Sequence, residues 1–176
     1  NNIASLNSQM ALTVNSSLLG KSISRIASGE RIHSAADDAG SMAIAQGIKS
    51  DIVALQQGSR NMNDGISLVK VAEGGLGEIS AMLIRLRELA SQSATGTIGQ
   101  NERGTLQLEY TALANEINRI SNSTEFGRQK LLDGSLAATA SQPIIIQVGR
   151  NTSSDDRVNL NASLNLTALT TAGLGI

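Results

Sequence analysis

Few side chains in this 176-residue chain have the types and spacing that chemistry requires, and the nearest to a site are His33 and Asp37. They are four residues apart, so a helix would place an imidazole and a carboxylate on one face, where they could bind a metal or transfer a proton. Carboxylates also occur in pairs, at Asp37 with Asp38 and at Asp155 with Asp156. A lone histidine without a second nitrogen ligand favours a structural role, and helix capping and a turn account for the carboxylate pairs. We therefore predict no catalytic residue, no metal site and no cofactor.

The composition excludes several classes of protein. The chain contains no cysteine, so disulfide scaffolds and cysteine nucleophiles are excluded. It has 14 Lys and Arg against 15 Asp and Glu, a net charge of −1, and no basic stripe of the kind that binds nucleic acid. Its apolar runs are too short to span a bilayer, and no charged start with an apolar core marks a cleavable signal peptide. We predict that the protein is not an enzyme, binds no nucleic acid and does not insert into a membrane.

Turn and capping signals divide the first part of the chain. Residues 1–28 form an amphipathic stretch that a Ser-Gly pair ends, and residues 29–35 are predicted to be a connector. Ser34 and Asp37 have the spacing of a capping box at the start of a helix. No strong breaker follows, which predicts one helix over about 36–93.

The long helix has an apolar residue at every seventh position, as a coiled-coil seam does. The seam residues are Ile48, Leu55, Met62, Val69, Leu76 and Leu83. A third helix is predicted over about 101–122, and residues 123–134 are predicted to be irregular. The stripe of the third helix consists of Leu106, Tyr110, Leu113, Ile117 and Ile120.

The length of the predicted long helix decides the architecture. About 58 residues at 1.5 Å rise make a rod of about 87 Å, whereas a compact domain of this chain length is about 40 Å across. A third helix of about 22 residues would cover only about a third of the seam. The rest of the seam must be covered by other long helices, either from further chain or from other subunits.

The predicted fold is mainly α, an elongated rod of long coiled-coil-like helices with a small β-hairpin near the C-terminal end. Residues 36–134 would form the rod domain with its two helices, and residues 135–176 the hairpin and tail. The hairpin is predicted because 144–148 is rich in isoleucine and valine, while Val158 and Leu160 alternate with polar residues. The residues after the hairpin give no firm prediction.

Five segments, in this order, resemble the N-terminal half of bacterial flagellin. They are NIASLN at 2–7, SAADDAG at 34–40, NDGISL at 63–68, RELASQS at 87–93 and FGRQKLLDG at 126–134. The resemblance implies a structural subunit of the bacterial flagellar filament, a helical homopolymer of flagellin subunits that serves motility. It further implies an extracellular location, export without a cleavable signal peptide, and an export chaperone as a partner.

The resemblance also implies an arrangement of the segments. In flagellins the first helix joins an inner tube, the next two form a rod with a returning C-terminal helix, and the hairpin lies on the outer side. The sequence departs from the family at Glu30 and His33, where an apolar residue and Asn are usual. It departs again at Gly127-Arg128, where Asn-Gly is more usual. We expect local consequences, because neither departure changes a seam position.

A receptor-binding surface is implied as well. Arg85, Leu89 and Glu109 match positions through which many flagellins are bound by Toll-like receptor 5, although Ile84 and Ser91 differ from the commonest form of that motif. At 100° per residue, Arg85 faces away from the seam and Leu89 lies on its flank. The structural alternative is a solvated Arg85 and a Leu89 that packs on the third helix.

Two other functions stay open. A hook-filament junction protein is a relative of flagellin with a similar start, although LLDG at 131–134 favours flagellin. A flagellin-like surface adhesin or polysaccharide-binding protein could be built on the same rod. Pull-down with polysaccharide, under conditions that depolymerise filaments, would separate an adhesin from a polymer.

Overall fold

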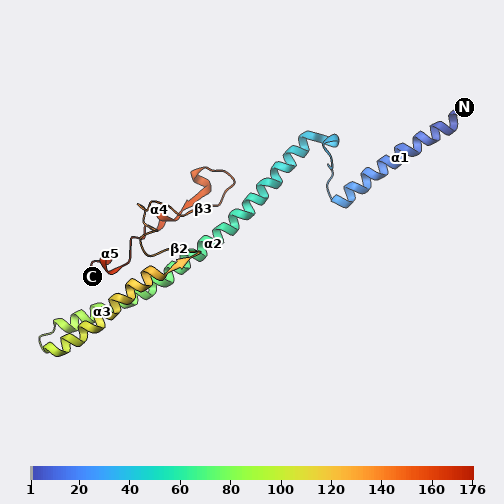
Figure 1. Cartoon of the computed structure of the whole chain (residues 1–176). Helices are drawn as coiled ribbons and strands as arrows, with labels where there is room; N and C mark the ends of the chain where they lie inside the picture. The colour runs from blue at the N-terminus through green and yellow to red at the C-terminus, as the bar shows by residue number, and fades with distance from the viewer. Residues whose placement is uncertain (1) are drawn as a thin grey trace. The chain divides into compact units, whose positions relative to one another are not determined.

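The computed structural model describes residues 2–176, and Asn1, where the first predicted segment starts, lies outside them. The chain divides into two units, one up to Val53 and the other Ala54–Ile176. Long helices dominate the described chain, and the short antiparallel strand pairs lie in the second unit (Figure 1). The predicted fold class, mainly α with long helices and a small β-hairpin, is confirmed.

The first helix, α1, spans Ile3–Ser28, and residues beyond each of its ends cap it. The side chain of Asn2 accepts a hydrogen bond from the backbone N–H of Ser5 over 3.3 Å, which satisfies one of the free donors of the first turn. Gly29 adopts φ 69°, the left-handed conformation that ends many helices and costs glycine little. The predicted end of the helix at the Ser-Gly pair is confirmed.

The second helix, α2, spans Ala35–Ala94, but its regular part begins at a different cap from the predicted one. Asp38 is extended (φ −165°, ψ 100°), and its carboxylate accepts hydrogen bonds from the backbone N–H and the hydroxyl of Ser41, over 3.0 and 2.6 Å. These bonds hold the pKa of Asp38 below its usual value. The predicted capping box is wrong, because Asp37 N–H donates to the backbone oxygen of Ser34 and forms a turn. Asp38 is therefore the N-cap.

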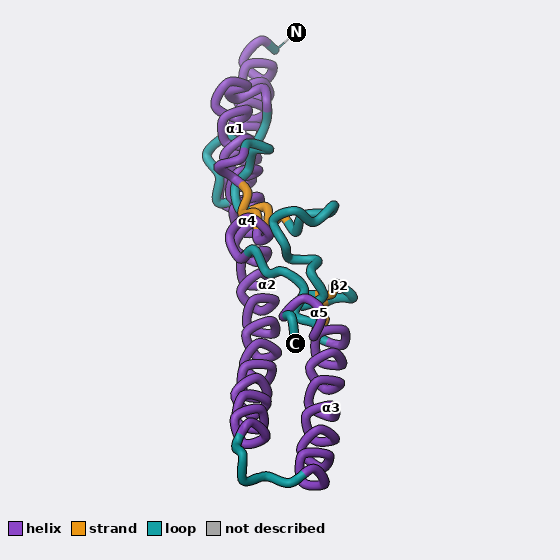
Figure 2. Tube along the Cα trace, turned by 90° about the vertical axis from the view of Figure 1, so that its left-hand side faces the viewer, coloured by secondary structure: helices purple, strands orange, loops and turns teal. Residues whose placement is uncertain are grey.

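The third helix, α3, spans Gln100–Ser123 and returns alongside the C-terminal part of α2 (Figures 1 and 2). The predicted range of 101–122 is correct to one residue at each end. Ile79 and Leu86 of α2 and Ile117 of α3 are buried in one apolar cluster. This cluster accounts for the pairing of two helices whose own glycines would make them marginal alone.

A short hairpin follows α3 where the sequence predicted irregular chain. Strand β1, Glu125–Phe126, pairs antiparallel with β2, Gln129–Lys130. The two residues between them, Gly127 and Arg128, both have positive φ, 56° and 71°. This is the two-residue turn that suits the twist of a hairpin, and it normally uses Asn-Gly. The prediction failed because strands of two residues carry no alternation to detect.

The turn places an arginine in the left-handed region, where a Cβ is crowded by the following carbonyl oxygen. We expect Arg128→Gly to raise the free energy of unfolding of the second unit by about 0.5 to 1 kcal/mol. Glycine relieves the backbone strain of the folded state, and this gain exceeds the loss that comes from the greater conformational freedom of glycine in the unfolded chain. Urea unfolding followed by the fluorescence of Tyr110 measures this unit alone, because it is the only tyrosine in the chain. Arg128→Ala keeps the Cβ and should give no gain; equal gains in the two variants would contradict the explanation.

The predicted C-terminal hairpin is confirmed. Strand β3, Ile145–Gln147, pairs antiparallel with β4, Arg157–Asn159, and a short 3₁₀ helix, η1, Ser154–Asp156, precedes β4. Asn61 of α2 donates a side-chain hydrogen bond to the backbone oxygen of Gln147 over 2.9 Å, which fastens the hairpin to the helix.

Turns, bends and two very short helices complete the core of the second unit. Leu131, Leu132 and Leu136 are fully buried, although they follow β2 in a stretch of turns and bends. Helix α4, Leu160–Leu164, and the single turn α5, Thr171–Leu174, pack partly buried leucines against the same cluster. The tail therefore belongs to the core of this unit.

Candidate functional site

The structure brings together two of the three residues singled out for receptor binding. Arg85 of α2 donates from Nε and Nη2 to Oε1 of Glu109 on α3, over 2.9 and 2.7 Å, and from Nη1 to Oε2 of Glu88 over 3.1 Å. The hydrogen bond to Glu109, followed by that to Glu88, raises the pKa of Arg85. The side chains of Arg85 and Glu109 stay 47% and 44% exposed, so a partner could reach this ion cluster from solvent.

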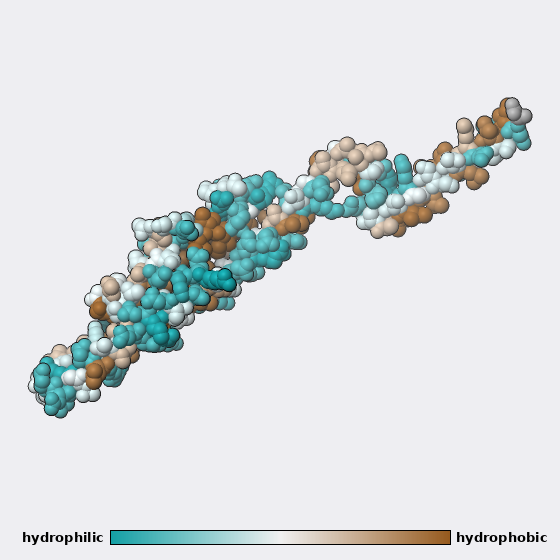
Figure 3. All heavy atoms as spheres, viewed as in Figure 1, coloured by the Kyte–Doolittle hydropathy of each residue, from teal (hydrophilic) through white to brown (hydrophobic). Residues whose placement is uncertain are grey.

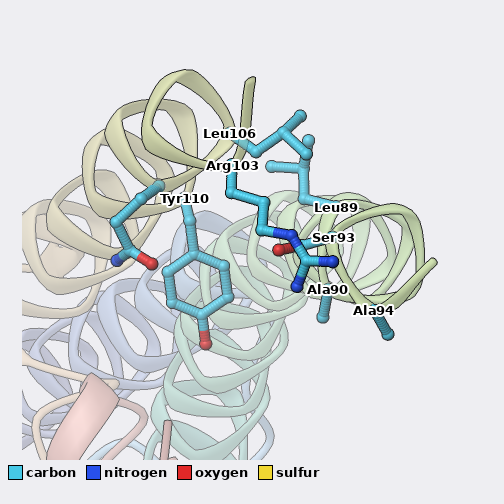
Figure 4. A pocket seen from close by; sticks show the side chains of 8 residues that line it. Leu89, Ala90, Ser93, Ala94, Arg103, Leu106 and Tyr110 are labelled. Atoms are coloured by element: carbon cyan, nitrogen blue, oxygen red, sulfur yellow. The ribbon is translucent and has the colours of Figure 1, made fainter. Parts of the chain in front are cut away.

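The third residue, Leu89, is not exposed. It retains 1% of its accessible surface and lines a hollow of about 350 Å³ between the two helices. Figure 4 shows that α3 contributes Arg103, Leu106 and Tyr110 to the lining, with the side chain of Leu106 beside that of Leu89. Leu89 thus packs between the helices, as the structural alternative expected.

The seam residues differ in burial along α2. Val69, Leu76 and Leu83 pack partly buried against the core, and Met62 is half-buried. On α3 the fully buried member is Ile117; the partly buried members are Leu106, Tyr110, Leu113 and Ile120. The other members of the α2 seam, Ile48 and Leu55, are 54% and 56% exposed. Contacts between the seam and other subunits stay a prediction.

Apolar side chains are also exposed along α1, which has no buried residue. Nine of its large apolar residues are between 57% and 82% exposed: Ile3, Leu6, Met10, Leu12, Val14, Leu18, Leu19, Ile23 and Ile26. Apolar groups lie on its visible face in Figure 3. Exposed apolar surface of this extent is typical of a protein interface, since burying it would contribute roughly 25 cal/mol per Å².

His33 and Asp37, considered above for metal or acid-base chemistry, line a hollow of about 260 Å³ at the connector. Asp37 forms ion pairs with Arg25 at 3.6 Å and with Lys21 at 4.0 Å, both from α1. Between residues 2 and 176, no three His, Asp or Glu side chains come together as metal ligands. The arrangement at Asp37 is that of an ion-pair cluster.

The acidic pair of the C-terminal hairpin has its expected place in a turn. Asp156 accepts hydrogen bonds from the backbone N–H of Asn151 over 2.9 Å and from the hydroxyl of Ser153 over 3.3 Å. Both bonds close the loop between β3 and β4.

Across the described residues, no helix is both long and apolar enough to cross a membrane.

Comparison with known proteins decides the family. The family model for the bacterial flagellin N-terminal helical region matches residues 1–137. The chain belongs to the bacterial flagellin family. Flagellins are structural proteins and not enzymes, which agrees with the prediction from the residues. The resemblance inferred from the five segments is thereby confirmed.

Individual flagellins match most of the chain. The B-type flagellin of Pseudomonas aeruginosa is 45% identical over 85% of it, and the flagellin of Bacillus subtilis is 39% identical over 90%. A crystal structure of Bacillus cereus flagellin superposes with a TM-score of 0.51, at 34% identity, over 65% of this chain and 60% of that one. This chain spans 30% of the length of the Pseudomonas flagellin and 55% of the Bacillus subtilis flagellin.

Sequence reasoning missed several charged partners. Glu88 lies three residues after Arg85, a spacing at which helical side chains meet, so the sequence offered a signal for it. Lys49 pairs with Glu30 from nineteen positions away, and no local pattern marks such a pair. Glu30 is one of the residues at which the sequence departs from the usual flagellin pattern.

Proposed function

We propose that this chain is part of a structural subunit of the bacterial flagellar filament, which assembles through helix packing with other subunits and serves motility. The observation that carries the proposal is the uncovered apolar surface of α1, combined with membership of the flagellin family. An extended apolar surface that repeats from subunit to subunit can form contacts that do not close on themselves, and such contacts generate a helical filament. The location would then be extracellular, with export assisted by a chaperone.

The proposal predicts a sensitive position on α1. Leu19 is 63% exposed. In the whole protein that carries this chain, Leu19→Ala should raise the critical concentration for polymerisation about tenfold, because about 1.5 kcal/mol of apolar burial per subunit is lost. Electron microscopy and sedimentation of polymerised against free protein give the measurement.

Ser16→Ala on the same helix is the matched control, since it changes an exposed polar residue and should leave the critical concentration unchanged. An unchanged critical concentration in both variants would argue against α1 as a polymer contact.

Binding to polysaccharide by protein that does not polymerise would instead favour the adhesin alternative. The relatives that match here are named flagellins, which supports a filament subunit over a hook-filament junction protein.

A second proposal concerns recognition. We propose that Arg85, Glu109 and the supporting Leu89 form a surface for Toll-like receptor 5, as the resemblance implies. The observation that favours it is the contact between Arg85 and Glu109, 24 residues apart in sequence, which fixes both side chains on one exposed surface. A surface that is ordered before binding loses less conformational freedom when a partner docks.

Removal of Arg85 should therefore weaken receptor activation. We expect Arg85→Ala to raise the half-maximal concentration in a reporter-cell assay about tenfold, the usual effect of truncating a charged anchor at an interface. Arg87→Ala removes the same charge two positions away and is the control. Equal responses of native, Arg85→Ala and Arg87→Ala protein would remove the receptor proposal and leave the filament proposal intact.

A further inference from the structure

The side chains that oxidants attack most readily are few in this chain. It has no cysteine and no tryptophan, and its four methionines stand at positions 10, 42, 62 and 82. Thiolates and thioethers are the side-chain groups that peroxides oxidise at sulfur, so the thioethers of methionine carry this chemistry where cysteine is lacking. Oxidation at sulfur is therefore confined to four positions of this sequence.

The four methionines differ in their exposure. Met10 in α1 keeps 65% of its surface accessible, and Met42, near the start of α2, keeps 39%. Met62 and Met82 are half-buried, and Met82 packs against the core of the second unit. Because a peroxide must reach the sulfur atom to react, Met10 should be oxidised faster than the other three.

Met10 also lies within the uncovered apolar surface of α1. Leu6 and Val14 lie about one turn before and one turn after it on the same face, and they are 62% and 57% exposed. With Gln9 and Thr13, these three residues line a groove of about 470 Å³ along the helix. A chemical change at Met10 would therefore alter the surface through which α1 is proposed to contact other subunits.

We propose that Met10 is an oxidation-sensitive site in the polymer contact of α1. Conversion of its thioether to the sulfoxide by a peroxide keeps the free subunit from assembling, and reduction of the sulfoxide restores assembly. This inference rests on the proposed filament function, in which a second copy of the same protein covers the apolar surface of α1.

The chemical step is a two-electron oxidation at sulfur. A lone pair of Sδ attacks one oxygen of hydrogen peroxide, the O–O bond breaks, an S–O bond forms, and the second oxygen leaves as water. The sulfoxide oxygen accepts hydrogen bonds from water, and a subunit that covers it with apolar groups removes them, which opposes assembly. Two thiols reverse the step, because they give two electrons to the sulfur and become a disulfide while the oxygen leaves as water.

The first measurement is the rate of oxidation at each methionine in the dilute, unpolymerised whole protein that carries this chain. Hydrogen peroxide is added, and peptide mass spectrometry follows the gain of an oxygen atom at each position. We expect Met10 to react about five times as fast as Met62 and Met82, in line with its exposure. Equal rates at these three positions would overturn the proposal.

The second measurement is the critical concentration for polymerisation of the oxidised protein. Oxidation at Met10 should raise it about tenfold. Dithiothreitol, together with methionine sulfoxide reductases for both epimers at sulfur, should return it to its starting value. A critical concentration that stays raised after mass spectrometry shows Met10 to be reduced would overturn the proposal, since other damage would then cause the effect.

Two variants locate the effect at Met10. Met10→Leu keeps an apolar side chain of similar volume and helix propensity, so it should polymerise like the native protein and lose its sensitivity to peroxide. Met82→Leu is the matched control, because it removes a half-buried methionine and should stay sensitive. If circular dichroism shows that Met82→Leu has lost helix content, Met62→Leu replaces it. Sensitivity that persists in Met10→Leu would overturn the proposal.

Leu19→Ala separates this inference from the filament proposal on which it rests. If Leu19→Ala raises the critical concentration but oxidation of Met10 does not, the oxidation site is overturned and α1 remains a polymer contact. If neither change raises it, α1 is not a polymer contact, and the oxidation proposal is overturned with it.

Discussion

Replacement of Asn161 by alanine is expected to lower the free energy of unfolding of the second unit by about 3 kcal/mol. Asn161 is 1% exposed, and its side-chain amide makes three hydrogen bonds to backbone groups. Its Oδ1 accepts from the N–H of Ile144 over 2.8 Å, and its Nδ2 donates to the oxygens of Ser135 and Ala137 over 2.8 and 2.9 Å. Alanine leaves the N–H of Ile144 and the oxygen of Ser135 without this partner, and it leaves the oxygen of Ala137 with only the N–H of Ala140. Water hardly reaches this place, so polar groups that lose a hydrogen bond there lose free energy that water does not restore.

The effect of Asn161 can be separated from a general effect of asparagine removal. Asn159 caps α4 by accepting from the N–H of Ala162 over 3.2 Å at an exposed position. Asn159→Ala should cost only about 1 kcal/mol, the usual value for a lost helix cap. Urea unfolding followed by Tyr110 fluorescence gives both values. Losses of equal size would show that the buried network contributes no more than one exposed cap.

The second large effect is expected at Gly58, where the chain directly after β3 lies against α2. A Cβ at Gly58 would overlap the backbone oxygen of Val148 and lie 2.8 Å from its carbonyl carbon. A backbone carbonyl cannot move away by changing rotamer, as a side chain can. Gly58→Ala should therefore displace the C-terminal hairpin from α2. We expect a loss of about 2 kcal/mol, the range for overpacking, despite the better helix propensity of alanine.

Gly74 provides a control of opposite sign in the same helix. It is exposed, and a Cβ there would meet nothing within 4 Å. Gly74→Ala should therefore raise the free energy of unfolding by about 1 kcal/mol through helix propensity alone. The hydrogen-exchange protection of the amide of Val148, which is bonded to Asp156, reports the hairpin directly. A gain in stability for both variants would show that the hairpin does not press on α2 at Gly58.

Elements with strong local signals could be predicted from the sequence. The end of α1 follows from a glycine that tolerates positive φ, and the bounds of α3 follow from a stripe of period 3.6. The predicted start of α2 at about 36 is correct to one residue, but the predicted capping box at Ser34 and Asp37 was wrong, because the carboxylate of Asp38 accepts the hydrogen bonds of Ser41 at a break in the helical backbone. The hairpin of residues 125–130 was missed, since two-residue strands have no pattern.

Burial could not be predicted in the same way. Leu131, Leu132 and Leu136 have no periodic spacing, and they are buried because α2, α3 and the tail converge on them. Asn161 resembles any polar residue of a Ser-, Thr- and Asn-rich tail, and its partners lie 17 to 26 positions away. Such contacts depend on where the chain returns in space, which sequence spacing does not encode.

The sequence by itself determined the long helices, the C-terminal hairpin and the family, because helix periods, caps and motifs are local in the chain. It singled out Arg85, Leu89 and Glu109 as a prediction through the family resemblance. The tertiary structure decided that Arg85 meets Glu109, that Leu89 is buried between the helices, and that Glu30 pairs with Lys49. Each of these facts joins residues that only folding brings within a few ångströms of one another.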